Sequence, residues 1–127
     1  MAQKLSFADL FDIEMEGWCI GIKKNIDNLD PRSILQVISE LYGVFHAAIE
    51  KNYVFNIIAV AEHFSVAANR KVNQKTIVFY ILSLFPHPKD LTAEQKKTMD
   101  QIIDQVEDTF GGAHKRLQKR WNMEEDW

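Results

Sequence analysis

Residues 53–85 read YVFNIIAVAEHFSVAANRKVNQKTIVFYILSLF, and this stretch decides the fold of the chain. Apolar residues recur at helical spacing in the first part of the stretch: Val54, Ile57, Ile58, Ala61 and Phe64. A polar turn follows, with Asn69, Arg70, Lys71 and Asn73. A second helix is expected to begin at Gln74, which completes the layout of a helix-turn-helix DNA reader. A recognition helix presents polar side chains to base edges, yet eight of the ten residues from 76 to 85 are apolar. The pattern therefore predicts a second helix that packs in a core or against another protein.

The chain has 127 residues, which favours one domain with a sizeable core of its own. A single cysteine, Cys19, excludes an internal disulfide, and the N-terminal residues do not have the pattern of a secretory signal. The longest apolar run covers residues 77–82, far short of the ~20 residues that span a bilayer. A net charge of −3 neither steers the chain to nucleic acid nor excludes it. We expect a protein of the cytoplasm without membrane contact.

Two helices are predicted before the helix-turn-helix-like segment. Ser6, with Asp9 three residues later, has the capping pattern that opens a first helix, and the apolar stripe of this helix continues to residue 29. Asp30 followed by Pro31 opens a second helix, because the carboxylate caps free amides and proline suits the first helical position. The apolar pattern extends this second helix to about residue 51.

Two more helices are predicted after the proline-broken loop at residues 86–90. Thr92 and Gln95 have the spacing of a capping box, and the pair Gly111 and Gly112 ends or kinks the helix that they open. A short last helix covers residues 113–121, and the tail 122–127 is expected to fray. Period-two alternation is absent over any useful length. The sequence predicts an all-α fold, a compact single-domain bundle of about six helices that contains the helix-turn-helix-like segment.

The second helix has an apolar arc that covers about half of its circumference. Turning each residue by about 100° places one group at the centre of the arc and two groups at its edges. The centre holds Ile34, Ile38, Leu41, Phe45 and Ala48, one edge holds Val37 and Val44, and the other holds Leu35, Tyr42 and Ile49. This arc is wider than the apolar stripe that a helix needs to pack against a single hydrophobic core. Either another protein covers part of the arc, or the helix is buried between two neighbours of the same domain.

Residues that would carry chemistry are scattered in this sequence. The four histidines lack the spacing of a zinc site, and no glycine loop of a phosphate-binding type is present. Cys19 lies beside Trp18 on an amphipathic helix, where a small buried apolar residue is favoured over a nucleophile. We therefore predict no enzyme, no cofactor and no metal site.

Several residue runs resemble one known family. They are Lys24-Asn25-Ile26-Asp27, residues 28–30, Arg70-Lys71-Val72-Asn73-Gln74, residues 91–98, and Phe110-Gly111-Gly112. In order and spacing they are similar to the AsiA family, the small anti-sigma factors of T4-like bacteriophages, from near Asn28 to Trp121. The most specific part is the turn that begins at Arg70. Residues 1–29 form an additional amphipathic helix without counterpart, so residues 30–121 are the anti-sigma-like core.

The resemblance implies an all-helical protein that acts in the bacterial host cytoplasm. Proteins of that family bind region 4 of the primary sigma factor within RNA polymerase, block recognition of the −35 promoter element and, with a phage co-activator, redirect the polymerase. The resemblance also implies an effect on the polymerase β-flap and self-association of the free protein. It does not imply sequence-specific DNA binding. The implied contact residues are Ile34, Ile38, Leu41, Tyr42 and Phe45, with Val60 and Phe64 beside them and Arg70, Asn73 and Gln74 as a polar rim.

The extra N-terminal helix has two possible effects on this surface, because by folding back over the second helix it would either cover the sigma-binding face or add to it. Two other functions also stay open. A DNA-binding repressor would use residues 54–85, with the basic cluster of residues 115–120 as a phosphate clamp. A helical immunity or chaperone-type module would bind a protein of another class.

Overall fold

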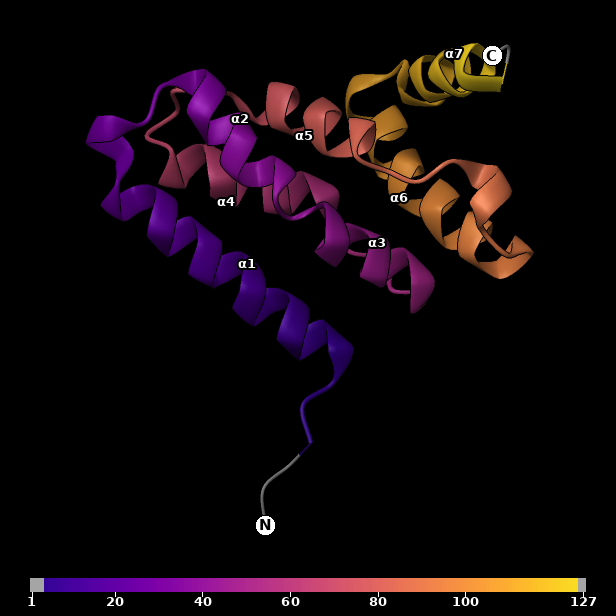
Figure 1. The fold of residues 1–127 in the computed structure, drawn as a ribbon, viewed down its shortest axis with the longest axis horizontal. Coiled ribbons are helices and arrows are strands. Elements are labelled where there is room, and N and C mark those ends of the chain that lie inside the picture. Colours follow the sequence, from indigo (N-terminus) through magenta and orange to yellow (C-terminus); the bar gives the residue numbers. More distant parts are fainter. Residues whose placement is uncertain (1–3, 126–127) are drawn as a thin grey trace.

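The computed structural model describes residues 4–125, with side chains to residue 123. This part of the chain is all-α, as predicted, with seven α-helices and two short 3₁₀ helices. The elements are α1 (Phe7–Lys24), η1 (Ile26–Asn28), α2 (Pro31–Ser39), α3 (Tyr42–Glu50), α4 (Ile57–Ala67), α5 (Gln74–Ser83), η2 (Pro88–Asp90), α6 (Ala93–Phe110) and α7 (Ala113–Glu125). Helix α1 packs on α3 and α4 at one end of the bundle, and α6 and α7 pack together at the other (Figure 1). No helix in the described residues is both long and apolar enough to cross a membrane.

Short polar side chains begin the helices where the sequence predicts. The Ser6 hydroxyl accepts from the Asp9 amide at 3.1 Å, and the Asp9 carboxylate accepts from the Ser6 amide at 3.2 Å. Thr92 and Gln95 form the same capping box at the start of α6. The Asp30 carboxylate caps α2 through the Ser33 amide at 2.7 Å. These signals are legible in the sequence because donor and acceptor lie three residues apart in the chain.

The predicted single helix from Asp30 to about residue 51 is wrong, because the chain forms two helices there. The amides of Glu40 and Leu41 bond the carbonyls of Val37 and Ile38, three residues back rather than four, and this tight turn separates α2 from α3. No proline marks the bend, and the apolar pattern continues through it. The bend lets α2 pack on α5 while α3 packs on α6 and α1. A single straight helix would have had to pack on α5 and also on α6 and α1.

Helix α5 is part of the core, as its composition predicts. It packs against α4, α2, α6 and α7, and its residues Ile77, Val78, Ile81 and Leu82 are buried. A DNA-reading helix needs one long side with polar side chains open to the major groove, and the central residues of α5 are instead apolar and packed against these neighbours. The apolar second helix of the helix-turn-helix-like segment is therefore a structural helix.

Four phenylalanines at the centre of the bundle join four parts of the chain. The Phe55 ring stacks on Phe11 at 5.0 Å and on Phe45 at 5.4 Å between ring centroids, and it meets Phe85 edge-on at 6.3 Å. Phe55 lies before α4 rather than in it, because Asn56 caps that helix through the Ala59 amide. The prediction that Val54 faces inward on a helix is wrong, since Val54 is exposed and its neighbour Phe55 is buried.

The turn between α6 and α7 depends on two glycines and one carboxylate. Gly111 and Gly112 have φ angles of 78° and 73°, in the left-handed region that favours glycine. The Glu107 carboxylate accepts from the Gly112 amide at 2.7 Å and from the His114 amide at 3.1 Å, which caps the start of α7. Helix α7 then continues to Glu125, four residues beyond the predicted end of the last helix at residue 121. Residues 126–127 lie outside the described residues.

Glu107→Gln is expected to destabilise the protein at neutral pH and to reduce its sensitivity to acid. The amides of His114 and Gly112 hold the pKa of Glu107 below its ordinary value of 4.5. A carboxylate with a lowered folded pKa contributes its full stability above its unfolded pKa and loses that contribution as the pH falls through the folded pKa. Urea unfolding from about pH 7 to about pH 3 measures the effect. The gap between wild type and variant should shrink as the pH falls, and a constant gap would contradict the assignment. Asp108→Asn, on the exposed side of α6, is the matched control.

Candidate protein-binding surface

The centre of the predicted contact face lies inside the molecule. Ile34, Ile38, Leu41 and Phe45 are at most 1% exposed, and Phe64 is fully buried beside them. The centre of the wide apolar arc is therefore covered by helices of the same chain. Of the two explanations that the sequence leaves open for the arc, burial within the domain accounts for Ile34, Ile38, Leu41 and Phe45 in this conformation.

Helix α1 covers part of this face rather than extending it. The Phe11 ring lies 6.4 Å from the Phe45 ring and stacks on Phe55, and Phe11, Met15 and Ile22 are all buried. Lys71 also ties the segment after α1 to the turn between α4 and α5, because its Nζ donates to the carbonyls of Ile26 at 2.6 Å and Leu29 at 2.8 Å. Helix α1 and the segment after it are thus integrated with the rest of the bundle.

Two of the predicted apolar contact residues remain accessible. Tyr42, the first residue of α3, is 58% exposed and meets the His46 ring edge-on at 5.6 Å. The His46 Nε2 lies 2.7 Å from the carbonyl oxygen of Leu84, which holds this ring against the end of α5. Val60 is half-buried and lines a groove between α1 and α4. Tyr42 is the predicted contact residue with the largest free apolar surface.

The predicted polar rim residues shape the turn between α4 and α5. Arg70 has a φ of +56°, its amide bonds the Ser65 carbonyl, and its exposed guanidinium pairs with Glu62 at 2.9 Å. Asn73 caps α5 through the Thr76 amide at 2.8 Å, and the Gln74 amide group donates to the Ile58 carbonyl at 3.0 Å. All three side chains thus have local structural roles. The exposed side chains of Arg70 and Asn73 are also open to a partner.

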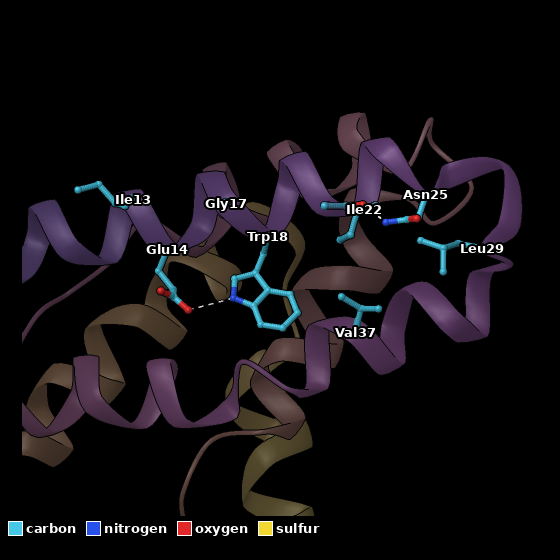
Figure 2. Close-up of a pocket in the computed structure, with 9 residues that line it drawn as sticks. Ile13, Glu14, Gly17, Trp18, Ile22, Asn25, Leu29 and Val37 are labelled. Atoms are coloured by element: carbon cyan, nitrogen blue, oxygen red, sulfur yellow. Dashed lines mark hydrogen bonds between the residues drawn. The ribbon is translucent and has the colours of Figure 1, made fainter.

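Two grooves run along the sides of α1. The first, of about 450 Å³, lies between α1 and α2 and has Trp18, Ile22, Leu29 and Val37 among its lining residues (Figure 2). The Trp18 indole Nε1 donates to the Glu14 carboxylate at 3.0 Å at the edge of this groove. The second, of about 610 Å³, lies between α1 and α4 and includes Val60. The sequence pattern predicts the inward stripe of α1, and it does not reveal these grooves because they depend on how far apart the helices sit.

Cys19 lines the second groove and is not suited to nucleophilic chemistry. Burial, and next the negative charge of Glu16, raise the pKa of the Cys19 thiol from 9.0 to about 11. At neutral pH the thiol therefore stays protonated, whereas the thiolate is the reactive form. Within the described residues, no three His, Cys, Asp or Glu side chains gather as a metal site would require.

The basic cluster at the start of α7 attaches that helix to the bundle. Arg120 donates to the carbonyls of Ser83 at 2.5 Å and Phe85 at 2.9 Å, at the C-terminal end of α5. The Arg116 guanidinium lies 4.2 Å from the centre of the Phe79 ring, and the His114 ring contacts Asp104. Arg116 and Arg120 of the cluster thus pack against the chain itself, while Lys115 and Lys119 are exposed, which leaves a smaller cationic surface for the DNA-binding alternative.

The accessible candidate residues are therefore Tyr42, the side chains that line the two grooves beside α1, and the turn around Arg70. Exposed aromatic and apolar side chains of this kind, with charged groups such as Arg70, are the groups that protein-binding surfaces use. Comparisons of the chain with protein-family models, with curated proteins and with solved structures gave no match.

Proposed function

We propose that this chain is a transcription regulator of the anti-sigma type, which binds region 4 of the primary sigma factor of a bacterial host and blocks recognition of the −35 promoter element. The observation that carries the proposal is the turn of residues 70–74. Its run Arg-Lys-Val-Asn-Gln is the most specific part of the resemblance to the AsiA family, and it occupies the corner between α4 and α5. The helix after it is apolar and enclosed on several sides. A helix-turn-helix scaffold of this kind suits a protein partner better than DNA.

The contact surface of the proposed complex begins with Tyr42. Large aromatic side chains contribute strongly to binding when a partner buries them, and this one is already held in place by the His46 ring. Val60 in the α1–α4 groove supplies further apolar area, and Arg70 supplies a charged rim. The remaining predicted apolar residues are buried inside the bundle, so engaging them would require its helices to separate. The proposed complex therefore forms on the folded bundle with α1 in place.

Binding to purified sigma region 4 and to RNA polymerase holoenzyme tests the proposal. The wild-type chain should be retained by both, and Tyr42→Arg should weaken binding by at least about tenfold, as expected for loss of a buried aromatic contact. Met123→Arg is the matched control, because Met123 is 61% exposed on another helix, α7, and is not a predicted contact residue. Both variants should keep the wild-type helical content and melting temperature, since neither residue is buried.

Each other outcome would count against a stated part of the proposal. A wild-type chain that binds neither sigma nor holoenzyme contradicts the function. A Tyr42→Arg variant that binds as well as Met123→Arg contradicts the assigned surface. Affinity for duplex DNA alone, falling steeply with salt, would favour a repressor. Retention of a partner outside the polymerase would favour the immunity or chaperone class.

A further inference from the structure

The groove of about 610 Å³ between α1 and α4 is lined by one face of each helix. On both helices the lining positions recur at every third or fourth residue, which is the spacing of a single helix face. Two exposed branched side chains line it from different helices, Ile20 at 47% and Val66 at 57% exposure. Met15, Cys19 and Val60 add further apolar surface. Apolar side chains that converge on one open groove indicate a surface that another molecule covers.

The two helices run in the same direction along this groove. Near their starts, Phe11 of α1 stacks on Phe55, which lies just before α4. Beyond their ends, Lys71 donates to carbonyl groups of the segment that follows α1. The lined part of α1 covers 11 residue steps from Asp12 to Lys23 (23 − 12), or about 16 Å at about 1.5 Å per residue. A third helix of about three turns has this length, and its apolar ridge fits between two neighbouring helices.

Two carboxylates give one end of the groove a negative charge. Asp12 and Glu16 are exposed one turn apart on α1, and within the described residues neither has an ion-pair partner. Their charge acts on the groove itself. Burial, and next the charge of Asp12, raise the pKa of Tyr53, and burial with the charge of Glu16 raises the pKa of Cys19. This end of the groove therefore attracts cationic groups.

The opposite end of the groove is basic. Lys23 lines it about three turns beyond Asp12, and His63 of α4 is the remaining titratable side chain of the lining. A complementary partner therefore carries cationic groups beside Asp12 and Glu16 and an acidic group beside Lys23. Helices are ordinarily stabilised by acidic residues in their first turn and basic residues in their last turn. A helix with this usual arrangement matches the groove when it lies antiparallel to α1.

We propose that the α1–α4 groove binds an amphipathic helix of another protein, with its apolar side on Ile20, Val60 and Val66 and its basic end beside Asp12 and Glu16. In this mode of recognition an apolar helix face lies in a hydrophobic groove. The groove shares Val60 with the surface of the proposed sigma complex, yet it selects a helix by its charges and apolar stripe alone. The inference therefore goes beyond the proposed function and holds whether or not sigma supplies this helix.

A synthetic peptide and the full-length chain test the groove. The probe is a helical peptide of about 14 residues with an apolar stripe, glutamates in its first turn and lysines in its last two turns. Fluorescence anisotropy should show saturable binding, and Ile20→Glu and Val66→Glu should each raise the dissociation constant at least about tenfold. Ile13→Glu, at a 56% exposed position of α1 outside this groove, is the matched control and should bind like the wild type. All three variants should keep the wild-type melting temperature.

Cys19 reports whether the probe lies in the groove, because it is the single cysteine of the chain and lines this groove. At a probe concentration about ten times the dissociation constant, alkylation of Cys19 by a maleimide should slow about tenfold, since about one site in ten stays open. Protection of Cys19 without the probe, rising with protein concentration, would indicate a second copy as the occupant and would overturn the proposal.

Charge reversal tests the assigned ends of the groove. Asp12→Lys with Glu16→Lys should weaken binding of the lysine probe at least about tenfold and favour a probe with glutamates in place of the lysines. Glu94→Lys with Asp108→Lys makes the same change in net charge on α6 and is the matched control.

The remaining outcomes separate this proposal from the proposed function. The groove proposal is overturned if the wild type does not bind the lysine probe at concentrations up to about 1 mM, or if it binds both probes equally. It is also overturned if Ile20→Glu and Val66→Glu bind the probe as Ile13→Glu does. A chain that binds the probe but not sigma contradicts the proposed function alone.

Discussion

A chain carrying both Ile38→Asp and Leu41→Asp is expected to be largely unfolded at room temperature. Ile38 is fully buried and Leu41 is 1% exposed, so both changes place a carboxylate in the apolar core. Losing the packing of a buried isoleucine or leucine costs about 2–5 kcal/mol at each site, and burial of an unpaired polar group adds to this. The sum is comparable with the whole stability of a domain, about 5–15 kcal/mol. The double variant therefore removes the fold and, with it, any binding.

Far-UV circular dichroism and urea unfolding measure this effect directly. Tyr42→Asp is the matched control on the same predicted face, and it should unfold within about 0.5 kcal/mol of wild type because its side chain is mostly exposed. A double variant that melts with wild-type cooperativity would show that the arc is open in solution, contrary to this structure. The comparison also separates a contact residue from a core residue, since loss of sigma binding in the double variant would report unfolding alone.

Removal of residues 1–25 is the second change with a large expected effect. Helix α1 buries Phe11, Met15 and Ile22, and each fully buried side chain of this size contributes about 1.5–3 kcal/mol. The three together amount to about 5–9 kcal/mol, and their loss also uncovers Phe45 and Phe55. The shortened chain is expected to lose cooperative unfolding and to bind an apolar dye such as ANS.

Two single substitutions test the contribution of α1 to stability without removing residues 1–25. Phe11→Ala should lower the free energy of unfolding by about 3–5 kcal/mol, whereas Ile13→Ala, on the outer side of α1, should change it by less than about 0.5 kcal/mol. Urea unfolding at neutral pH measures both. A shortened chain that unfolds cooperatively at nearly the wild-type urea concentration would contradict the assignment. In that case α1 would be a removable cover over the face that the sequence assigns to sigma.

Helix starts that depend on a few neighbouring residues could be predicted from the sequence. The capping pairs that start α1 and α6, the Asp30 cap and the start of α5 at Gln74 all lie where the sequence predicts them. Each depends on a side chain that bonds an amide two or three positions away, so no knowledge of the rest of the fold is needed. The core position of α5 was equally predictable, because eight of the ten residues from 76 to 85 are apolar and four of them are buried in this helix.

Features that depend on contacts between distant parts of the chain could not be predicted from the sequence. The bend at Glu40 and Leu41 contains no proline or glycine, the nearest glycine being Gly43 inside α3, and α2 and α3 pack on different neighbours on its two sides. Phe55 lies outside any helix, and its burial depends on Phe11 and Phe85, which are 44 positions before it and 30 after it (55 − 11 and 85 − 55). Which residues of the candidate surface are exposed also depends on packing between distant parts of the chain. Tyr42 and Leu41 are neighbours in the sequence, yet one is mostly exposed and the other is buried.

The sequence by itself determined that this chain is helical, where most of its helices begin, and that the helix after the turn at Arg70 belongs to a core. Only the tertiary structure decided what covers the wide arc from Ile34 to Phe45, and that α1 buries one stripe while leaving Leu10, Ile13 and Ile20 on the surface. The physical reason is that helical periodicity records which residues avoid water, whereas the molecule that shields them is set by how the helices pack.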